Sequence, residues 1–183
     1  MNNTASIEKL EKCIEKGYLC AVNREIIDTF SLYGYPVRSK GELAVMLFVY
    51  DFMPDGFKII RKRDITEVYG GKEERFLDKV VKSEHPELEI IAPSLKIDSM
   101  RALCEDLMQK SQIVTVECED FEENIILIGQ IVNVNKNVVT MKTFDGLGVW
   151  DDEMASVELE DITCVSIGNS YVNIISKYLI ERK

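Results

Sequence analysis

Five cysteines and one histidine are the side chains in this sequence best suited to metal binding or nucleophilic chemistry. They are Cys13, Cys20, Cys104, Cys118, Cys164 and His85. The cysteine count is odd and no Cys-x-x-Cys pair occurs, which predicts reduced thiols and no zinc ribbon or thioredoxin-type site. A single histidine excludes any site that needs two histidine ligands. His85 lies in a polar helix-end segment, which favours a solvated turn residue.

Two short motifs resemble cation or phosphate sites only in part. The run Asp151-Asp152-Glu153 lacks the alternating ligands and central glycine of a calcium loop. Gly70-Gly71-Lys72 resembles the end of a phosphate-binding loop, but Thr66 and Glu73 stand where that loop needs a glycine and a hydroxyl. We therefore predict no metal, no cofactor and no small-molecule substrate.

Aspartates recur in pairs along the chain, as Asp51 with Asp145 and Asp64 with Asp161. Paired carboxylates can serve acid–base catalysis. Each of these aspartates, however, lies beside turn residues, where its side chain can accept hydrogen bonds from nearby backbone N–H groups. The chain carries no other catalytic constellation, so we predict that it is not an enzyme.

A basic stretch is the best candidate for a nucleic-acid or partner-binding site. It comprises Arg38, Lys40, Lys58, Arg61, Lys62 and Arg63. Aromatic residues suited to base stacking, such as Tyr33 and Phe57, are close in sequence. Two interpretations remain open, a surface that balances an acidic chain through ion pairs and a weak site for RNA or an acidic partner.

Trp150 is the only tryptophan and stands beside the acidic run. An exposed tryptophan makes a good protein-partner anchor, and a packed one covers the end of a folded unit. Both interpretations of Trp150 stay open.

Composition places the chain among globular proteins. Its 183 residues are 46% hydrophobic and 30% charged, which suits one large domain or two small ones. No apolar run approaches the roughly 20 residues of a membrane helix, and residues 1–6 do not resemble a signal peptide. We therefore expect a cytoplasmic protein that does not engage membranes.

The net charge of −10 is unevenly distributed. Residues 1–92 hold 14 Lys and Arg against 16 Asp and Glu, whereas residues 93–183 hold 8 against 16. An acidic surface repels phosphate backbones, so a broad nucleic-acid interface is disfavoured, above all in the second half.

The clearest signal in the sequence is an internal duplication. Asp64-Ile65-Thr66-Glu67-Val68 recurs 97 residues later as Asp161-Ile162-Thr163-Cys164-Val165. A glycine follows each copy three residues on, as Gly71 and Gly168. The pattern predicts two copies of one structural unit.

Each copy is predicted to run helix, five short strands, helix. Apolar residues spaced by three and four predict opening helices around 7–14 and 100–107 and closing helices around 76–81 and 171–178. Turn residues delimit the strand segments between them. The predicted strands are Tyr18–Arg24, Ile27–Val37, Leu43–Phe52, Phe57–Arg61, Ile65–Tyr69, Ile113–Cys118, Asn124–Val134, Val138–Phe144, Ala155–Leu159 and Ile162–Ile167.

Five short antiparallel strands bury little apolar side-chain surface if they form an open sheet with water on both faces. A closed barrel gives the same strands one apolar interior. We therefore predict an α+β, mainly β chain of two tandem five-stranded small barrels, each with an N-terminal and a C-terminal helix. The first unit spans 1–86, a linker spans 87–97, and the second unit spans 98–183.

A helix followed by five bent strands resembles the Sm-like small barrels. Gly129, Ile131, Val134 and Asn135 match the spacing of the first Sm motif. The resemblance implies ring assembly through strand edges and binding of uridine-rich RNA. Val139 stands where the family carries its RNA-binding asparagine, and Glu160-Asp161 and Arg63-Asp64 stand where it carries an arginine-glycine pair. These departures weaken the implied RNA binding.

The sequence therefore favours a non-enzymatic assembly or interaction module that binds a protein partner or itself. The alternative is a single-stranded RNA-binding protein that uses the basic stretch of the first unit.

Overall fold

The computed structural model describes residues 3–119 and 124–181, and this part of the chain is mainly β with four α-helices. The helices are α1 (Thr4–Lys16), α2 (Lys72–Glu84), α3 (Met100–Gln109) and α4 (Ser170–Ile175). Ser99 caps α3 by accepting a hydrogen bond from the Ala102 N–H at 3.2 Å, and Asn169 caps α4 in the same way. All four helices lie where the apolar spacing predicts them.

The described residues also form ten strands. They are β1 (Cys20–Arg24), β2 (Asp28–Lys40), β3 (Leu43–Tyr50), β4 (Met53–Arg61), β5 (Glu67–Tyr69), β6 (Ile113–Cys118), β7 (Ile125–Val134), β8 (Val138–Phe144), β9 (Trp150–Glu158) and β10 (Cys164–Ile167). Each overlaps a predicted strand. A short 3₁₀ turn, η1 (Lys62–Asp64), separates β4 from β5.

The prediction of two closed barrels is wrong. The strands form one open antiparallel sheet in the order β5-β1-β2-β3-β4-β10-β6-β7-β8-β9. Strand β4 does not turn back onto β5; it pairs with β10 of the other half, and this joint makes the sheet continuous. Pairing with the other half satisfies the backbone groups that barrel closure would otherwise have satisfied.

The two halves repeat one strand order. The first half reads β5-β1-β2-β3-β4, and the second reads β10-β6-β7-β8-β9. Gly34 of β2 and Gly129 of β7 occupy matching positions, because they pair with Phe48 and Thr143 and a bulge follows each pair at the same spacing. A Cβ at either glycine would lie about 2 Å from a carbonyl oxygen of the next strand, so both halves need glycine where these strands approach closely.

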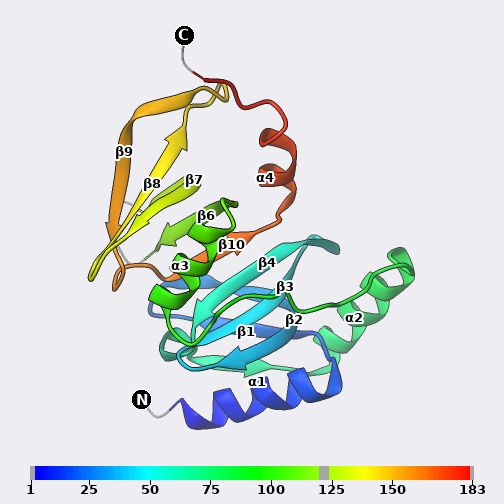
Figure 1. Cartoon of the computed structure of the whole chain (residues 1–183). Helices are drawn as coiled ribbons and strands as arrows, with labels where there is room; N and C mark the ends of the chain where they lie inside the picture. Colours follow the sequence, from blue (N-terminus) through cyan, green and yellow to red (C-terminus); the bar gives the residue numbers. More distant parts are fainter. Residues whose placement is uncertain (1–2, 120–123, 182–183) are drawn as a thin grey trace.

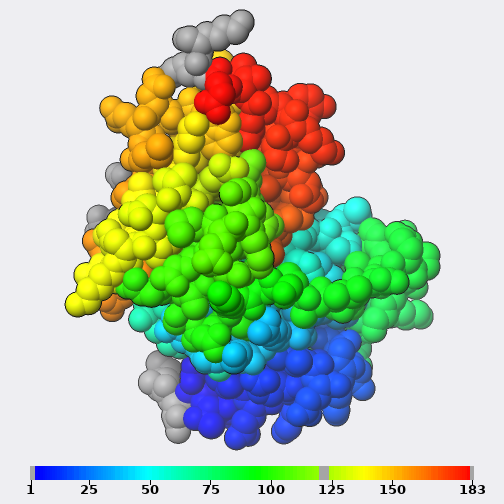
Figure 2. All heavy atoms as spheres, viewed as in Figure 1, coloured from blue at the N-terminus to red at the C-terminus, as the bar shows by residue number. Residues whose placement is uncertain are grey.

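Figure 1 shows the second half stacked on the first, with α1 below the first half and the chain termini at opposite ends of the molecule. The segment that follows α2 crosses one face of the molecule and leads into α3, which in Figure 2 lies between the blue first half and the yellow-to-red second half. Leu95 and Ile97 of this segment are buried. The predicted linker therefore packs against the body of the protein.

The hydrophobic core is shared across the halves. Leu43, Val45 and Ile59 of the first half pack into the main core of the second half, with α3 against them. Cys164 of the second half packs into the core beneath α1. A third cluster lies beneath α2 and contains Tyr35. No helix among the described residues is long and apolar enough to cross a membrane.

Candidate functional site

Backbone hydrogen bonds and side-chain contacts join the two halves at the joint between β4 and β10. Strands β4 and β10 pair antiparallel over four residues, from Phe57 opposite Ile167 to Ile60 opposite Cys164. Gly56 allows the close approach at one end, because a Cβ there would lie 2.5 Å from the backbone of Ile167 and Asn169. Backbone pairing and close packing therefore join the halves at the same strands.

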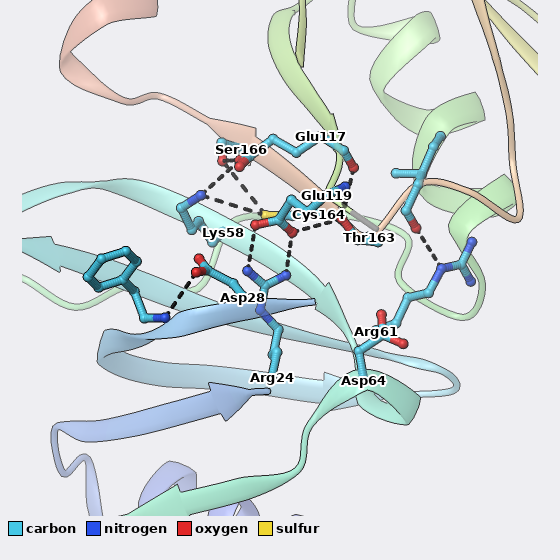
Figure 3. Close-up of polar contacts among 12 residues, drawn as sticks. Arg24, Asp28, Lys58, Arg61, Asp64, Glu117, Glu119, Thr163, Cys164 and Ser166 are labelled. Carbon is cyan, nitrogen blue, oxygen red and sulfur yellow. Dashed lines mark hydrogen bonds and ion pairs between the residues drawn. The ribbon is translucent and has the colours of Figure 1, made fainter. Parts of the chain in front are cut away.

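A buried ion pair strengthens the joint (Figure 3). The Arg24 guanidinium is fully buried and donates two hydrogen bonds to the Glu119 carboxylate, at 2.6 and 2.7 Å. Thr163 donates a third to Glu119 at 2.7 Å. Burial alone would raise the pKa of Glu119, but these bonds and the Arg24 charge outweigh it and hold that pKa below its ordinary value. Both charges are therefore present at neutral pH, which is the condition for a strong bidentate pair.

Lys58 forms a second polar contact across the joint. Its Nζ donates to Glu117 Oε1 at 2.8 Å, and Ser166 donates to the same oxygen at 2.9 Å. The ammonium also lies 5.3 Å from the centre of the Phe48 ring. Burial alone would lower the pKa of Lys58, but the neighbouring Cys164 and Glu117 raise it overall. The lysine therefore stays charged inside the joint.

Arg61 forms the third contact. Its Nε donates to the Ile162 carbonyl at 2.7 Å, and its Nη2 donates to the Leu159 carbonyl. Glu42 lies 3.3 Å from the same guanidinium and also accepts a hydrogen bond from the Met100 N–H at 2.6 Å. Burial lowers the pKa of Arg61, although an arginine remains charged in proteins at neutral pH. Arg61 and Glu42 thus connect β4 to the second half and to α3.

The six predicted basic residues do not gather on one open surface. Arg38 donates to the Leu95 carbonyl at 2.8 Å, and Lys40 pairs with Asp98 at 2.7 Å. Lys58 and Arg61 are engaged in the joint as described. Lys62 and Arg63 line a pocket of about 520 Å³ together with Arg61, but Glu8, Glu11 and Glu42 line it as well.

Arg63 also donates to the Glu160 carbonyl at 3.0 Å, on the far side of the joint. The predicted cationic site is therefore for the most part a set of contacts between the two halves and the segment that connects them.

Trp150 packs among its neighbours at the start of β9. Its ring lies 5.6 Å from Phe144 in an edge-on arrangement, and the Lys142 ammonium lies 5.0 Å from the ring centre. Its backbone N–H donates to the Ile180 carbonyl at 3.1 Å. These contacts favour the packed interpretation of Trp150.

Two of the recurring aspartates, Asp145 and Asp64, make local contacts. Asp145 Oδ1 accepts hydrogen bonds from the Leu147 and Val149 N–H groups at 2.8 and 3.0 Å. Asp64 is buried and lies 3.5 Å from Arg63. Among the described residues, no group of three or more His, Cys, Asp or Glu side chains is placed to hold a metal ion.

The sequence did not single out the partners of the buried cations. Arg24, Glu117, Glu119 and Ser166 look like ordinary strand or turn residues, and their contacts join positions 49 to 95 residues apart. The sequence feature that lies nearest to these residues is the duplicated segment, because its second copy contains Thr163 and Cys164.

No protein-family model, curated protein or solved structure matches this chain.

The two outer strands of the sheet, β5 and β9, are the counterparts of the two strands in the joint. In the first half Val22 pairs with Val68 of β5, and in the second half Val116 pairs with Val165 of β10. Val165 follows Val68 by 97 positions, so β10 is the counterpart of β5. In the same way Met46 pairs with Lys58 of β4 and Met141 pairs with Ala155 of β9, so β9 is the counterpart of β4, again 97 positions later.

Both outer strands leave an edge open. In the described part of the chain, the only backbone bridge on the outer side of β9 joins Val149 to Ile180, at the first end of the strand. Residues 152–154 of β9 and Tyr69 of β5 are exposed. An open strand edge presents unpaired N–H and C=O groups to any strand that can align with it.

Proposed function

We propose that this protein is an assembly module whose copies join edge to edge, with β9 of one copy against β5 of the next. One observation carries the proposal. The chain already contains this type of joint, between β4 and β10, and the open strands β9 and β5 are the counterparts of those two strands. A head-to-tail contact of this kind closes into a ring or grows as a filament.

The internal joint supplies the register of the proposed one. Carrying each pair over with the offset of 97 places Glu67 opposite Val157, Val68 opposite Ser156, and Tyr69 opposite Ala155. In this register the exposed ring of Tyr69 covers the small Ala155 side chain of the next copy. An aromatic ring against an apolar neighbour is a stabilising cross-strand pair.

Charge supports the same arrangement. Arg61 contacts the turn at 159–162 within the chain, and the counterpart of Arg61 in β9 is Glu158. The counterpart of that turn is the segment 62–65, which begins with Lys62 and Arg63. Glu158 of one copy would therefore face two cations of the next. Opposite charges would then meet at the proposed joint, as Arg24 and Glu119 do at another position of the internal joint.

The proposed joint lacks the buried ion pairs of the internal one. Ala155 stands where β4 has Lys58, and Cys118 stands where β1 has Arg24. We therefore expect a weaker and reversible joint whose formation depends on protein concentration.

Light-scattering mass across a gel-filtration concentration series tests the proposal. The expected result is a species of several times 20.9 kDa that Glu158→Lys dissociates and that Glu158→Lys combined with Lys62→Glu and Arg63→Glu restores. Ile91→Asp, at an exposed apolar residue of the connecting segment, is the matched control and should leave the mass unchanged. A mass of 20.9 kDa at every concentration would overturn the proposal.

Single-stranded RNA binding by the first half is the alternative proposal. Lys62 and Arg63 support it, because they line the 520 Å³ pocket. Two observations weaken it: glutamates line the same pocket, and the other four basic residues are engaged within the chain, three in ion pairs and Arg38 with the Leu95 carbonyl. Absorbance at 260 and 280 nm, recorded on the gel-filtration peak, tests it: an excess at 260 nm that high salt removes is the expected result for RNA binding.

A relation to Sm-like proteins also remains a proposal. It is supported by the first-motif spacing and by the helix-plus-five-strand order of each half, and it does not involve closed barrels.

A further inference from the structure

Cys13 and Cys20 lie beside each other although they belong to different elements. Helix α1 ends at Gly17, whose φ of 60° reverses the chain, and the Tyr18 N–H closes the turn on the Cys13 carbonyl at 3.0 Å. Strand β1 then begins at Cys20. Both side chains belong to the core cluster beneath α1, and each thiol shifts the pKa of the other.

Cys13 is accessible in a way that the other thiols are not. It lines a pocket of about 420 Å³ whose other lining residues include Gly70, Arg75 and Asp78. Its exposed fraction is 9%, whereas the remaining four cysteines, Cys20, Cys104, Cys118 and Cys164, are 0% exposed. A small reagent that enters this pocket therefore meets the sulfur of Cys13 before any other.

The surroundings favour the thiolate of Cys13. The neighbouring Cys20 thiol lowers the pKa of Cys13 to about 7, against the opposing effect of burial and with help from the Lys16 charge. In turn, Cys13, burial and the nearby Glu74 raise the pKa of Cys20, so that Cys20 keeps its proton. By contrast, burial raises the pKa of Cys104 to about 12.

We propose that Cys13 and Cys20 form a dithiol that hydrogen peroxide converts to a disulfide between α1 and β1. The Cys13 thiolate attacks one peroxide oxygen, the O–O bond breaks, and the departing hydroxide takes a proton to form water. The sulfur of Cys20 then attacks the Cys13 sulfenic acid, the S–O bond breaks, and the departing hydroxide takes the Cys20 proton to form a second water. Two thiols are oxidised and one peroxide is reduced.

This inference is independent of the proposed assembly, because it concerns contacts within one copy. Cys13 and Cys20 are seven positions apart in the sequence and flank a turn. Because the loop that the disulfide would close is short, its closure costs little chain entropy.

Peptide mapping of the native protein tests the proposal directly. Trypsin cuts after Lys12, Lys16 and Arg24, so the disulfide would link peptide 13–16 to peptide 17–24. After treatment with hydrogen peroxide and alkylation of the remaining thiols, we expect to find this linked pair. Its mass should be about 2 Da below the sum of the two reduced peptides, because two hydrogens are lost, and the linked pair should disappear on reduction. Cys104 and Cys164 of the same sample are internal controls and should stay reduced.

The rate of alkylation without peroxide gives a second readout. At pH 7, a pKa of about 7 in place of the ordinary 9.0 gives about 50-fold more thiolate, and the accompanying loss of nucleophilicity leaves roughly a five- to tenfold faster reaction. Cys20→Ala removes the neighbouring thiol and should slow iodoacetamide labelling of Cys13 by about that factor. Three results of the peroxide treatment would overturn the proposal: Cys13 stays a free thiol, Cys13 becomes a sulfinic acid without any linked peptide, or Cys13 forms a disulfide with a cysteine other than Cys20.

Discussion

Removal of Glu119 should destabilise the protein far more than removal of an exposed glutamate. The Glu119→Ala substitution leaves the buried Arg24 guanidinium without the two hydrogen bonds, at 2.6 and 2.7 Å, that its Nη1 and Nη2 now donate. Breaking a buried pair on one side costs about 3–5 kcal/mol. A chain of this size loses roughly 2–4 °C of melting temperature for each kcal/mol. The expected fall in Tm is therefore on the order of 6–20 °C.

Thermal and urea unfolding, followed by circular dichroism, measure the loss. Glu89→Ala, at an exposed glutamate of the connecting segment, is the matched control and should stay within about 0.5 kcal/mol of wild type. The double variant Arg24→Met with Glu119→Leu removes both charges and should recover most of the lost stability. A loss for Glu119→Ala no larger than that of the control would refute the role assigned to this pair.

Two further predictions concern the same joint. Gly56→Ala should lower the free energy of unfolding by about 1–3 kcal/mol, because the φ of 72° is strained for alanine and the new Cβ would meet the backbone of Ile167 and Asn169; urea unfolding with Gly146→Ala as control, where a Cβ meets nothing within 4 Å, checks this. The depressed pKa of Glu119 means that its contribution to stability is present above the ordinary value of 4.5 and is lost as the pH falls through the lower folded-state pKa. The stability difference between wild type and Glu119→Gln should therefore be large at pH 7 and shrink below pH 4.5, and urea unfolding at both pH values would contradict the assignment if the difference were constant.

The elements of this fold were predictable because their signals are local. Apolar spacing such as that of Leu103 and Leu107 marks a helix face, and both residues are buried as that spacing requires. The repeat that begins at Asp64 and Asp161 predicts two similar halves, and the strand order does repeat.

The joint was not predictable, because nothing local distinguishes a strand edge that closes a barrel from one that pairs with another unit. Ile60 and Cys164 are 104 positions apart, and their pairing decides between two barrels and one sheet. The same limit applies to the basic stretch. The sequence favours a surface position for Lys58 and Arg61, but Arg61 is buried against carbonyl oxygens of the second half and Lys58 is half-buried against Glu117.

Cross-linking in the predicted register tests the edge-to-edge assembly most directly. In the register given by the internal joint, Tyr69 lies opposite Ala155 of the next copy, with both side chains on one face of the sheet. The double variant Tyr69→Cys with Ala155→Cys should therefore form covalent multimers on mild oxidation, seen on non-reducing gels.

Tyr69→Cys with Ser156→Cys is the matched control, because successive residues of a strand point to opposite faces. We expect a ladder of multimers for the first pair and monomers for the second and for each single variant. Equal cross-linking of both pairs, or of neither at concentrations where light scattering finds multimers, would contradict the assembly through β5 and β9.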